Sequence, residues 1–194
     1  MNIQDSDFRL GELILFISQK SVDDTRFGAV KLNKLLFYSD ALAYAKWGAS
    51  ITGTEYWNQR EGPVPKRFVQ VRNQLMEESP QALAIQSIDI PGLRNPQVRT
   101  IALRTPKLGE FRGDRLLLVE DVVRQYWNFT GTELSNKSHL EWGWKLTSRE
   151  DTVDLSTILL SPLADQPNKH EQKRALELLE SDTEIHLQLE ALVA

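Results

Sequence analysis

A helix that is apolar on every side constrains this chain more than any other feature of its sequence. Segment 30–44 reads VKLNKLLFYSDALAY, and its apolar side chains surround a helical projection instead of forming one stripe. Such a helix should lie in the middle of a domain, packed on several sides. Gly48 follows it, at the place where a left-handed carboxy-terminal cap favours glycine.

The neighbouring segments predict a further helix and a strand. A first helix is expected from about Ser6 or Asp7, because either side chain can cap it. Its buried stripe would consist of Leu10, Leu13, Ile14 and Ile17. Residues 51–60 contain Thr, Tyr and Trp side chains, a composition that favours a short strand. Pro63 and Pro65 exclude a helix through the turn that comes next.

The middle of the chain predicts a helix and then a hairpin. Pro65 suits the first position of the helix, because no N–H group is needed there. The buried stripe of that helix would consist of Phe68, Val71 and Leu75. Residues 83–90 and 98–104 then predict the two strands of a hairpin, joined by a loop that contains two prolines.

The last third of the sequence predicts three helices. Asp114 is expected to cap the first and Gly131 to end it. The buried face of this helix would consist of Val119, Val122, Val123 and Tyr126. Residues 132–139 predict a short helix, which an aromatic loop follows. Residues 169–192 predict a last helix, with leucines along one side.

Together these elements predict a mainly helical α+β fold. The apolar helix would be its axis, beside a small antiparallel sheet made from the Trp57 segment and the hairpin. A length of 194 residues suits a single core, so we expect one domain over residues 1–164. Residues 165–194 would form an acidic helix that extends this domain. If that helix protrudes, its leucine side would serve as a partner or dimer surface.

Charge and composition exclude several classes of function. Residues 1–164 carry 20 basic and 20 acidic side chains, and residues 165–194 carry 3 and 7, so the tail supplies the net charge of −4. A balanced body attracts polyanions weakly, which disfavours bulk nucleic-acid binding. The absence of cysteine excludes disulfides and thiolate zinc sites. We expect a cytoplasmic protein, because the polar amino terminus is no signal peptide and no apolar run could span a membrane.

Several short motifs occur in a characteristic order. The first part reads Lys31-Leu32-Asn33-Lys34-Leu35-Leu36-Phe37-Tyr38, then Gly48, Trp57, Gly62-Pro63-Val64-Pro65 and Phe68. The second part runs from Glu133-Leu134-Ser135 through His139 to Trp144. Over about residues 8–146 this order resembles the Panacea domain, the SocA-like antitoxin domain of bacterial and phage proteins. The sequence departs from the usual pattern at Pro65, which follows Val64 without a spacer.

The resemblance implies structural roles for the motif residues. These are Lys31, Leu35, Tyr38, Trp57, Gly62, Pro63, Val64 and His139. His139 is also the strongest catalytic candidate, within a His-x-Glu sequence. Zinc deaminases with that sequence need cysteine ligands as well, which this chain lacks. We therefore expect His139 to hold the loop that follows it.

No other pattern indicates catalysis. A nucleophilic serine would need a Gly-x-Ser-x-Gly elbow or its equivalent, and a phosphate site would need a Gly-rich loop; neither occurs. His170 and His186 lie too far apart on one helix to share a metal ion. We expect no enzymatic activity, no cofactor and no metal site.

Two groups of side chains are candidates for binding a partner. The first is a basic run of Arg94, Arg99, Arg104, Lys107, Arg112 and Arg115, opposed by Glu110 and Asp114. Such a run is also typical of a solvated sheet edge, where charge prevents unwanted strand pairing. The second is the pair Trp142 and Trp144, whereas Trp57 and Trp127 are expected in the core. Because Arg and Trp are enriched at interface hot spots, the partner-binding set is Arg94, Arg99, Arg104, Arg112, Trp142 and Trp144.

The resemblance predicts an antitoxin-like protein that neutralises a cognate toxin by direct contact. A neighbouring gene would encode the toxin. One alternative is a proteolytic adaptor, a role also found in the family, which delivers a bound toxin to a protease. Another is a DNA-binding autoregulator that uses the basic hairpin region 94–115, although no helix-turn-helix pattern supports it. Homo-oligomerisation stays open.

Overall fold

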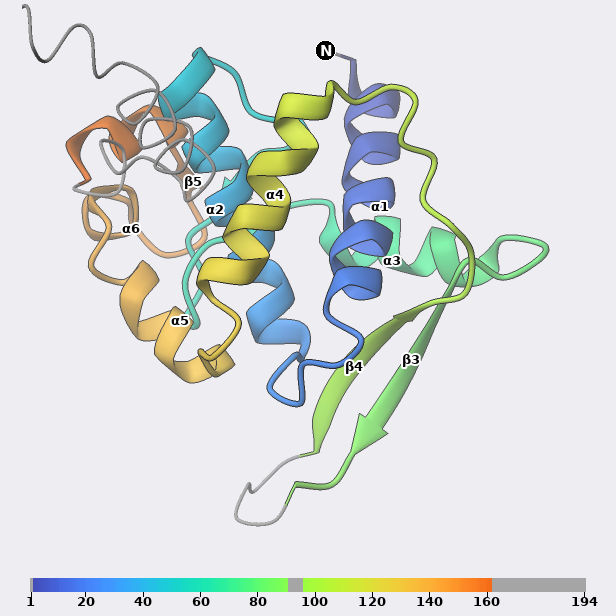
Figure 1. The fold of residues 1–194 in the computed structure, drawn as a ribbon. Coiled ribbons are helices and arrows are strands. Elements are labelled where there is room, and N and C mark those ends of the chain that lie inside the picture. Colours follow the sequence, from blue (N-terminus) through green and yellow to red (C-terminus); the bar gives the residue numbers. More distant parts are fainter. Residues whose placement is uncertain (1, 91–95, 162–194) are drawn as a thin grey trace, which may run out of the picture. The chain divides into compact units, whose positions relative to one another are not determined.

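The structure is a computed structural model that describes residues 2–90 and 96–161 (Figure 1). In chain order the described elements are α1 (Ile3–Lys20), α2 (Ala29–Trp47), β1 (Tyr56–Trp57), β2 (Val64–Pro65), α3 (Phe68–Glu77), β3 (Leu83–Ile88), β4 (Gln97–Ala102), α4 (Gly113–Gln125), α5 (Gly131–Ser138), α6 (Trp142–Leu146), β5 (Thr152–Val153) and the 3-10 helix η1 (Leu155–Leu160). A mainly helical α+β fold is therefore confirmed. Arg94 and the predicted helix 169–192 lie outside the described residues.

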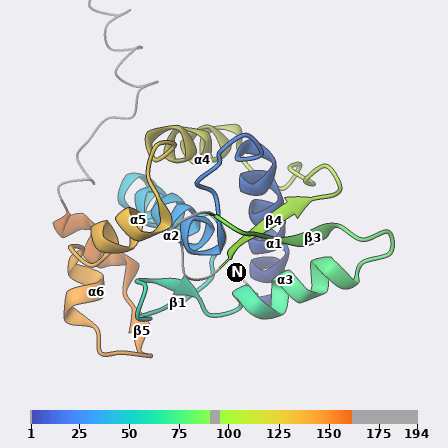
Figure 2. The same cartoon turned by 90° about the horizontal axis from the view of Figure 1, so that it is seen from below.

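Helix α2 is the axis of the fold, as its all-round apolar pattern predicts. Every residue from Lys31 to Ala41 is buried. The helix packs against α1, α4, α5 and η1, and Figure 2 shows it among α1, α4, α5 and β1. It begins after Gly28 and ends at Gly48, whose φ of 69° is the left-handed conformation that glycine adopts without strain. The predicted end at Gly48 is confirmed.

Helix α1 starts earlier than predicted. Its cap is Asn2, whose side-chain oxygen accepts a hydrogen bond from the Asp5 N–H at 2.9 Å. Asp7 instead forms an ion pair with Arg67, just before α3, so its carboxylate serves tertiary structure and not helix capping. The predicted apolar stripe of α1 is fully buried, and α3 packs against this helix.

The predicted strand 51–60 is wrong over most of its length. Only Tyr56 and Trp57 pair, in an antiparallel sheet of order β2-β1-β5. The segment before them forms hydrogen bonds to Asp40 of α2 and is not free to join a ladder. The placement of Pro65 at the start of a helix is also wrong: Pro65 pairs with Tyr56 in the edge strand β2, and α3 begins three residues later. An edge strand tolerates proline, because one side of it needs no hydrogen bond.

The hairpin is confirmed, with β3 and β4 in continuous antiparallel register. It forms a sheet of its own, so the prediction that it joins the Trp57 segment in one sheet is wrong. The reason is that β4 packs against α1, where the hydroxyls of Ser18 and Thr100 form a buried hydrogen bond of 2.7 Å. This contact holds β4 mainly against α1, with a smaller contact to α2, whereas β1 is held by Asp40 of α2.

The region from α4 to α6 has different boundaries from those predicted. Helix α4 begins at Gly113 without an Asp114 cap, and Gly131 does not end it but begins α5. Thr130 and Glu133 form a reciprocal capping box at that point. The predicted buried face of α4 and the short helix near 132–139 are confirmed. The predicted aromatic loop is instead the short helix α6.

No helix within residues 2–90 and 96–161 is long and apolar enough to cross a membrane.

A buried carboxylate ties α1 to the segment that follows the hairpin. Glu12 of α1 is 2% exposed, and both of its oxygens accept hydrogen bonds from Arg104, at 2.7 and 2.9 Å. The Lys107 N–H also donates to Glu12, and Arg104 reaches Glu78 at the end of α3. Arg104 is therefore an internal crosslink between three segments.

We predict that Arg104→Met destabilises the fold by about 3 kcal/mol, because it leaves the buried Glu12 carboxylate without its counter-ion. Chemical denaturation of the purified variant measures this loss. Arg112→Met is the matched control: its exposed pair with Asp114 should leave the free energy of unfolding unchanged within error. Equal effects of the two substitutions would contradict the internal role of Arg104.

Candidate functional site

The first lysine of the motif is a buried clamp. Lys31 Nζ donates hydrogen bonds to the carbonyl oxygens of Trp127 and Phe129, at 2.8 and 2.7 Å, and forms an ion pair with Asp24 at 2.6 Å. Burial lowers the pKa of Lys31, although the Asp24 carboxylate opposes that shift. The lysine thus joins the loops before α2 and after α4. Phe129 lies two residues before α5, so Lys31 holds the connection between α4 and α5 in place.

The second lysine, Lys34, lies one turn further along α2 and is 0% exposed. Its Nζ donates to the Pro63 carbonyl oxygen at 2.9 Å. Burial lowers the pKa of Lys34 from 10.5 to about 7, and the neighbouring Glu61 carboxylate only partly offsets this. Lys34 is thus a buried amine covered by the Gly62-Pro63 turn.

Gly62 is required by this turn for two reasons. Its φ is 94°, a conformation that other residues adopt only with strain. A Cβ atom at this position would also lie 2.1 Å from Ser138 Oγ and 2.9 Å from Lys34 Nζ. The Gly-Pro-Val motif is therefore a tight cover over α2 and α5. Leu35 and Tyr38 lie in the core on the same helix, as their structural roles require.

His139 forms part of the connection between α5 and α6. Its ring stacks on the Trp144 ring with centroids 4.1 Å apart, and it hydrogen-bonds the Arg60 backbone. Burial and the nearby Lys34 charge lower the pKa of His139. Nε2 is buried without a hydrogen-bond partner. Trp144 Nε1 donates to the Gln59 carbonyl oxygen at 3.2 Å. This imidazole packs between the chain segments that it joins.

Asp40 is a central residue that our sequence reasoning missed. This fully buried carboxylate of α2 accepts hydrogen bonds from the Ile51 and Thr52 N–H groups, at 2.7 and 2.9 Å. It also accepts from the hydroxyls of Thr52 and Tyr56. Burial raises the pKa of Asp40, and these donors oppose the shift. The sequence did contain a signal for this residue. A charged side chain in a helix that is packed on all sides must find its partners inside the protein.

Asn58 extends this network to α6. Its side-chain amide donates to the carbonyl oxygens of Trp144 and Thr147, at 3.0 and 2.6 Å. Sequence reasoning missed this residue too, since an Asn near a turn gives no specific signal. Through Asp40 and Asn58, α2 positions β1, and β1 positions the helix that carries Trp142.

The structure separates the arginines that the sequence grouped together. Arg104 is held internally by Glu12 and Glu78, Arg112 pairs with Asp114, and Arg115 stacks on Trp47 at 3.6 Å. Arg99 differs, because its guanidinium donates only to the uncharged Ser21 and Val22 carbonyls in this part of the chain. Its charge therefore has no carboxylate partner among the described residues.

The tryptophans also occupy different environments. Trp142 is 45% exposed on α6, with the Lys145 ammonium over its ring. Trp144, its neighbour in the predicted pair, is half-buried in the stack with His139. Trp127 packs against the core as expected, whereas Trp57 is 41% exposed, so its assignment to the core is wrong. Trp57 lies on β1, whose two residues face opposite sides, and Tyr56 takes the buried side.

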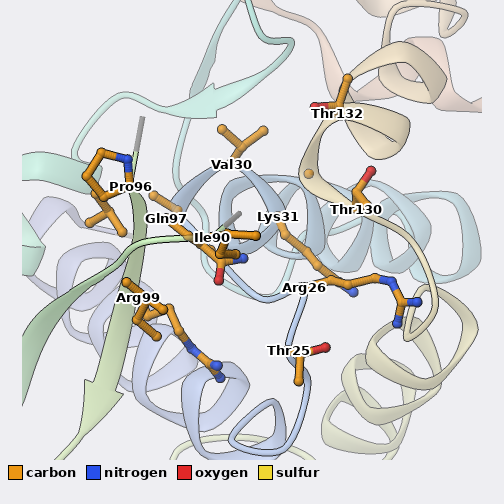
Figure 3. A pocket seen from close by; sticks show the side chains of 15 residues that line it. Thr25, Arg26, Val30, Lys31, Ile90, Pro96, Gln97, Arg99, Thr130 and Thr132 are labelled. Atoms are coloured by element: carbon orange, nitrogen blue, oxygen red, sulfur yellow. The ribbon is translucent and has the colours of Figure 1, made fainter. Parts of the chain in front are cut away.

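A groove of about 1100 Å³ lies where the hairpin, the start of α2 and the start of α5 meet. Figure 3 shows Arg99 and Gln97 on the hairpin side, Val30 and Lys31 at α2, and Thr130 and Thr132 on the α5 side. Arg26, just before α2, also lines it. No Asp or Glu is among the described lining residues.

The serines near the motif residues are held by internal hydrogen bonds. In residues 2–90 and 96–161, no cluster of three or more His, Asp or Glu side chains could hold a metal ion. Ser138 and Ser135 donate their hydroxyls to backbone carbonyls, and the buried charges are engaged in holding loops.

A protein-family model described as antitoxin SocA-like, Panacea domain, matches residues 32–145, more than half of the chain. The matched segment runs from the first turn of α2 into α6. It therefore contains Lys34, Asp40, the Gly62-Pro63 turn and His139. Searches of curated proteins and of solved structures gave no match.

The lowered pKa of Lys34 predicts that stability rises with pH between about 7 and 10. In this range the unfolded state keeps a proton that the folded state has lost, so raising the pH favours folding by up to about 1.4 kcal/mol per pH unit. Lys34→Met should reduce the slope by about one proton, measured by denaturation at several pH values. The exposed Lys107→Met variant should keep the wild-type slope; an unchanged slope in Lys34→Met would contradict the prediction.

Proposed function

Because this chain belongs to the SocA-like antitoxin family of the Panacea domain, we propose that it neutralises a cognate toxin by direct protein–protein contact. The family match over residues 32–145 is the observation that carries this proposal. Neutralisation of this kind requires only a stable surface that covers an essential part of the toxin. It requires no reaction and no cofactor.

The geometry of the motif residues supports a scaffold for binding. Lys31, Lys34 and Asp40 turn their charges inward, and each binds the backbone of a distant segment. Such groups fix the shape of the surrounding loops and are not accessible for chemistry. A rigid, preorganised surface loses little conformational freedom on association, which favours tight binding.

The proposed contact surface includes Trp142, the exposed Arg112 and the half-buried Arg99. Trp142 and Leu146 are exposed on α6, and Leu159 and Leu160 are exposed on η1, which packs beside α6. Tryptophan is enriched at interface hot spots, where the contacts around it contribute mainly by excluding water. Arg99 and Arg112 remain proposed contacts. Trp144 and Arg104 would act less directly, through the packing described above.

We predict that co-expression of this chain with the product of the adjacent toxic gene restores growth. The two purified proteins should also elute together as a complex. Rescue should be undiminished in a host that lacks its cytoplasmic proteases, because direct contact alone inactivates the toxin. Failure to rescue, with no complex formed, would refute the proposal. Rescue that requires a protease, together with toxin loss, would indicate a proteolytic adaptor instead.

A variant without the imidazole distinguishes contact from catalysis in the same assay. His139→Ala removes the stack on Trp144 and should lower thermal stability while rescue is retained. Loss of rescue by a folded His139→Ala protein that still binds the toxin would point to a chemical role for the imidazole.

We predict that Trp142→Ala weakens toxin binding about thirtyfold, which corresponds to about 2 kcal/mol for a desolvated anchor. Isothermal titration with the purified adjacent-gene product measures the change, and rescue should weaken in parallel. Trp57→Ala is the matched control, since Trp57 has similar exposure but lies on β1. A larger loss in Trp57→Ala than in Trp142→Ala would place the interface at β1.

A further inference from the structure

The groove between the hairpin, α2 and α5 is lined by two arginines, Arg26 and Arg99, that form no ion pair with another described residue. Arg26 is exposed and forms no ion pair with another described residue. Arg99 donates only to carbonyl groups there, and its Nε is buried without a partner. Lys31 contributes no net charge, because Asp24 neutralises it. Two guanidinium groups therefore line this space, and the described lining residues include no carboxylate, although the charge of Glu133 at the start of α5 acts on Arg26.

The backbone around the groove has the same sign of charge. Helix α2 begins here with no side-chain cap at Gly28 and no acidic residue in its first turn. The amino-terminal end of a helix carries partial positive charge, which favours anions. The neighbouring α5 differs, because Glu133 already occupies its start in the capping box.

The shape and lining of the groove indicate a ligand with apolar parts. Its volume of about 1100 Å³ exceeds the range of about 300–1,000 Å³ that is usual for small-molecule sites. Aliphatic side chains of Val30, Ile88, Ile90 and Val98 line it together with the arginines. Gln97 packs closely on Gly28 and fixes the hairpin against the start of α2.

We propose that this groove binds an acidic segment of the toxin, with carboxylates on Arg26 and Arg99 and apolar side chains on the aliphatic wall. This inference rests on the proposed function and names the chemistry of the partner. Arginine forms strong, directional hydrogen bonds with carboxylates, and a concave setting reduces the competition from water.

A nucleic acid fits these observations less well. Binding to a phosphate backbone relies on many cations along a track, whereas this groove presents two. A longer track would need the three other arginines near the hairpin. Arg104 and Arg112 pair with carboxylates, and Arg115 stacks on Trp47. The aliphatic wall also has no role against a phosphate backbone.

A direct test uses the full-length protein and a short fluorescent peptide of alternating Glu and Leu. The same peptide with Gln in place of Glu is the probe control. The Glu peptide should bind about tenfold more tightly than the Gln peptide, as fluorescence anisotropy will show. Equal binding of the two peptides, or no binding of the Glu peptide at millimolar concentration, overturns the proposal.

Two variants place negative charge in the groove without removing an internal contact. Arg26→Glu reverses an exposed charge, and Thr132→Glu adds one in the first turn of α5, where an acidic residue suits the helix dipole. Each should weaken binding of the Glu peptide about tenfold. The controls with the same charge changes are Arg72→Glu and Gln70→Glu on α3, which should bind like the wild type. Unchanged binding by Arg26→Glu and Thr132→Glu overturns the proposal.

The toxin assay then separates this inference from the proposed function. If the wild type rescues growth and a folded Arg26→Glu protein rescues equally well, the groove assignment fails while the antitoxin function stands. If the wild type does not rescue, the proposed function fails, and the peptide measurements alone decide the chemistry of the groove. A short DNA duplex that displaces the Glu peptide with a steep salt dependence would overturn the assignment to a protein segment.

Discussion

The fold depends on charged side chains that α2 carries into the interior and that backbone groups of other segments bind. Lys31 binds carbonyls beyond α4, Lys34 binds the carbonyl of the Gly62-Pro63 turn, and Asp40 binds the N–H groups of residues 51 and 52. A buried charge without partners would cost several kcal/mol, so each of these segments is held strongly in place. One helix thereby fixes loops that are 11 to 98 residues away from their anchors.

This dependence explains which parts of the fold sequence reasoning could predict. The pattern of apolar residues was sufficient for α1, α2 and α4, because the spacing of apolar side chains is a property of a segment on its own. The boundaries around Asp114 and Gly131 were wrong. At Gly131 the capping box of Thr130 and Glu133 begins α5, a local signal that our reasoning passed over when it placed the end of a helix there. The bonds from Lys31 to the Trp127 and Phe129 carbonyls, which hold the chain between α4 and α5, could not be predicted, because a local pattern carries no information about a distant partner.

Less of the candidate site could be predicted, because its residues are defined by partners that lie far away in the sequence. An apolar helix without a solvent-facing side implies that its lysines and aspartate are paired, yet it does not say with what. Trp57 was assigned to the core, but in this strand of two residues Tyr56 is the buried one. The composition of the segment cannot predict which of the two side chains faces the core. The motif order did predict the family, since that order reflects the whole set of contacts at once.

The distribution of charge in the structure differs from the distribution of charged residues along the sequence. The run 94–115 looks strongly basic in the sequence, but Glu12 and Glu78 compensate Arg104 from α1 and the end of α3. Arg26, which belongs to no basic run, instead lies at the same groove as Arg99. The positive surface that remains is therefore smaller than the run suggests, and it is concave and bordered by aliphatic side chains. A surface of that kind selects a partner through a few directed contacts, which suits recognition of one protein segment better than general attraction to a polyanion.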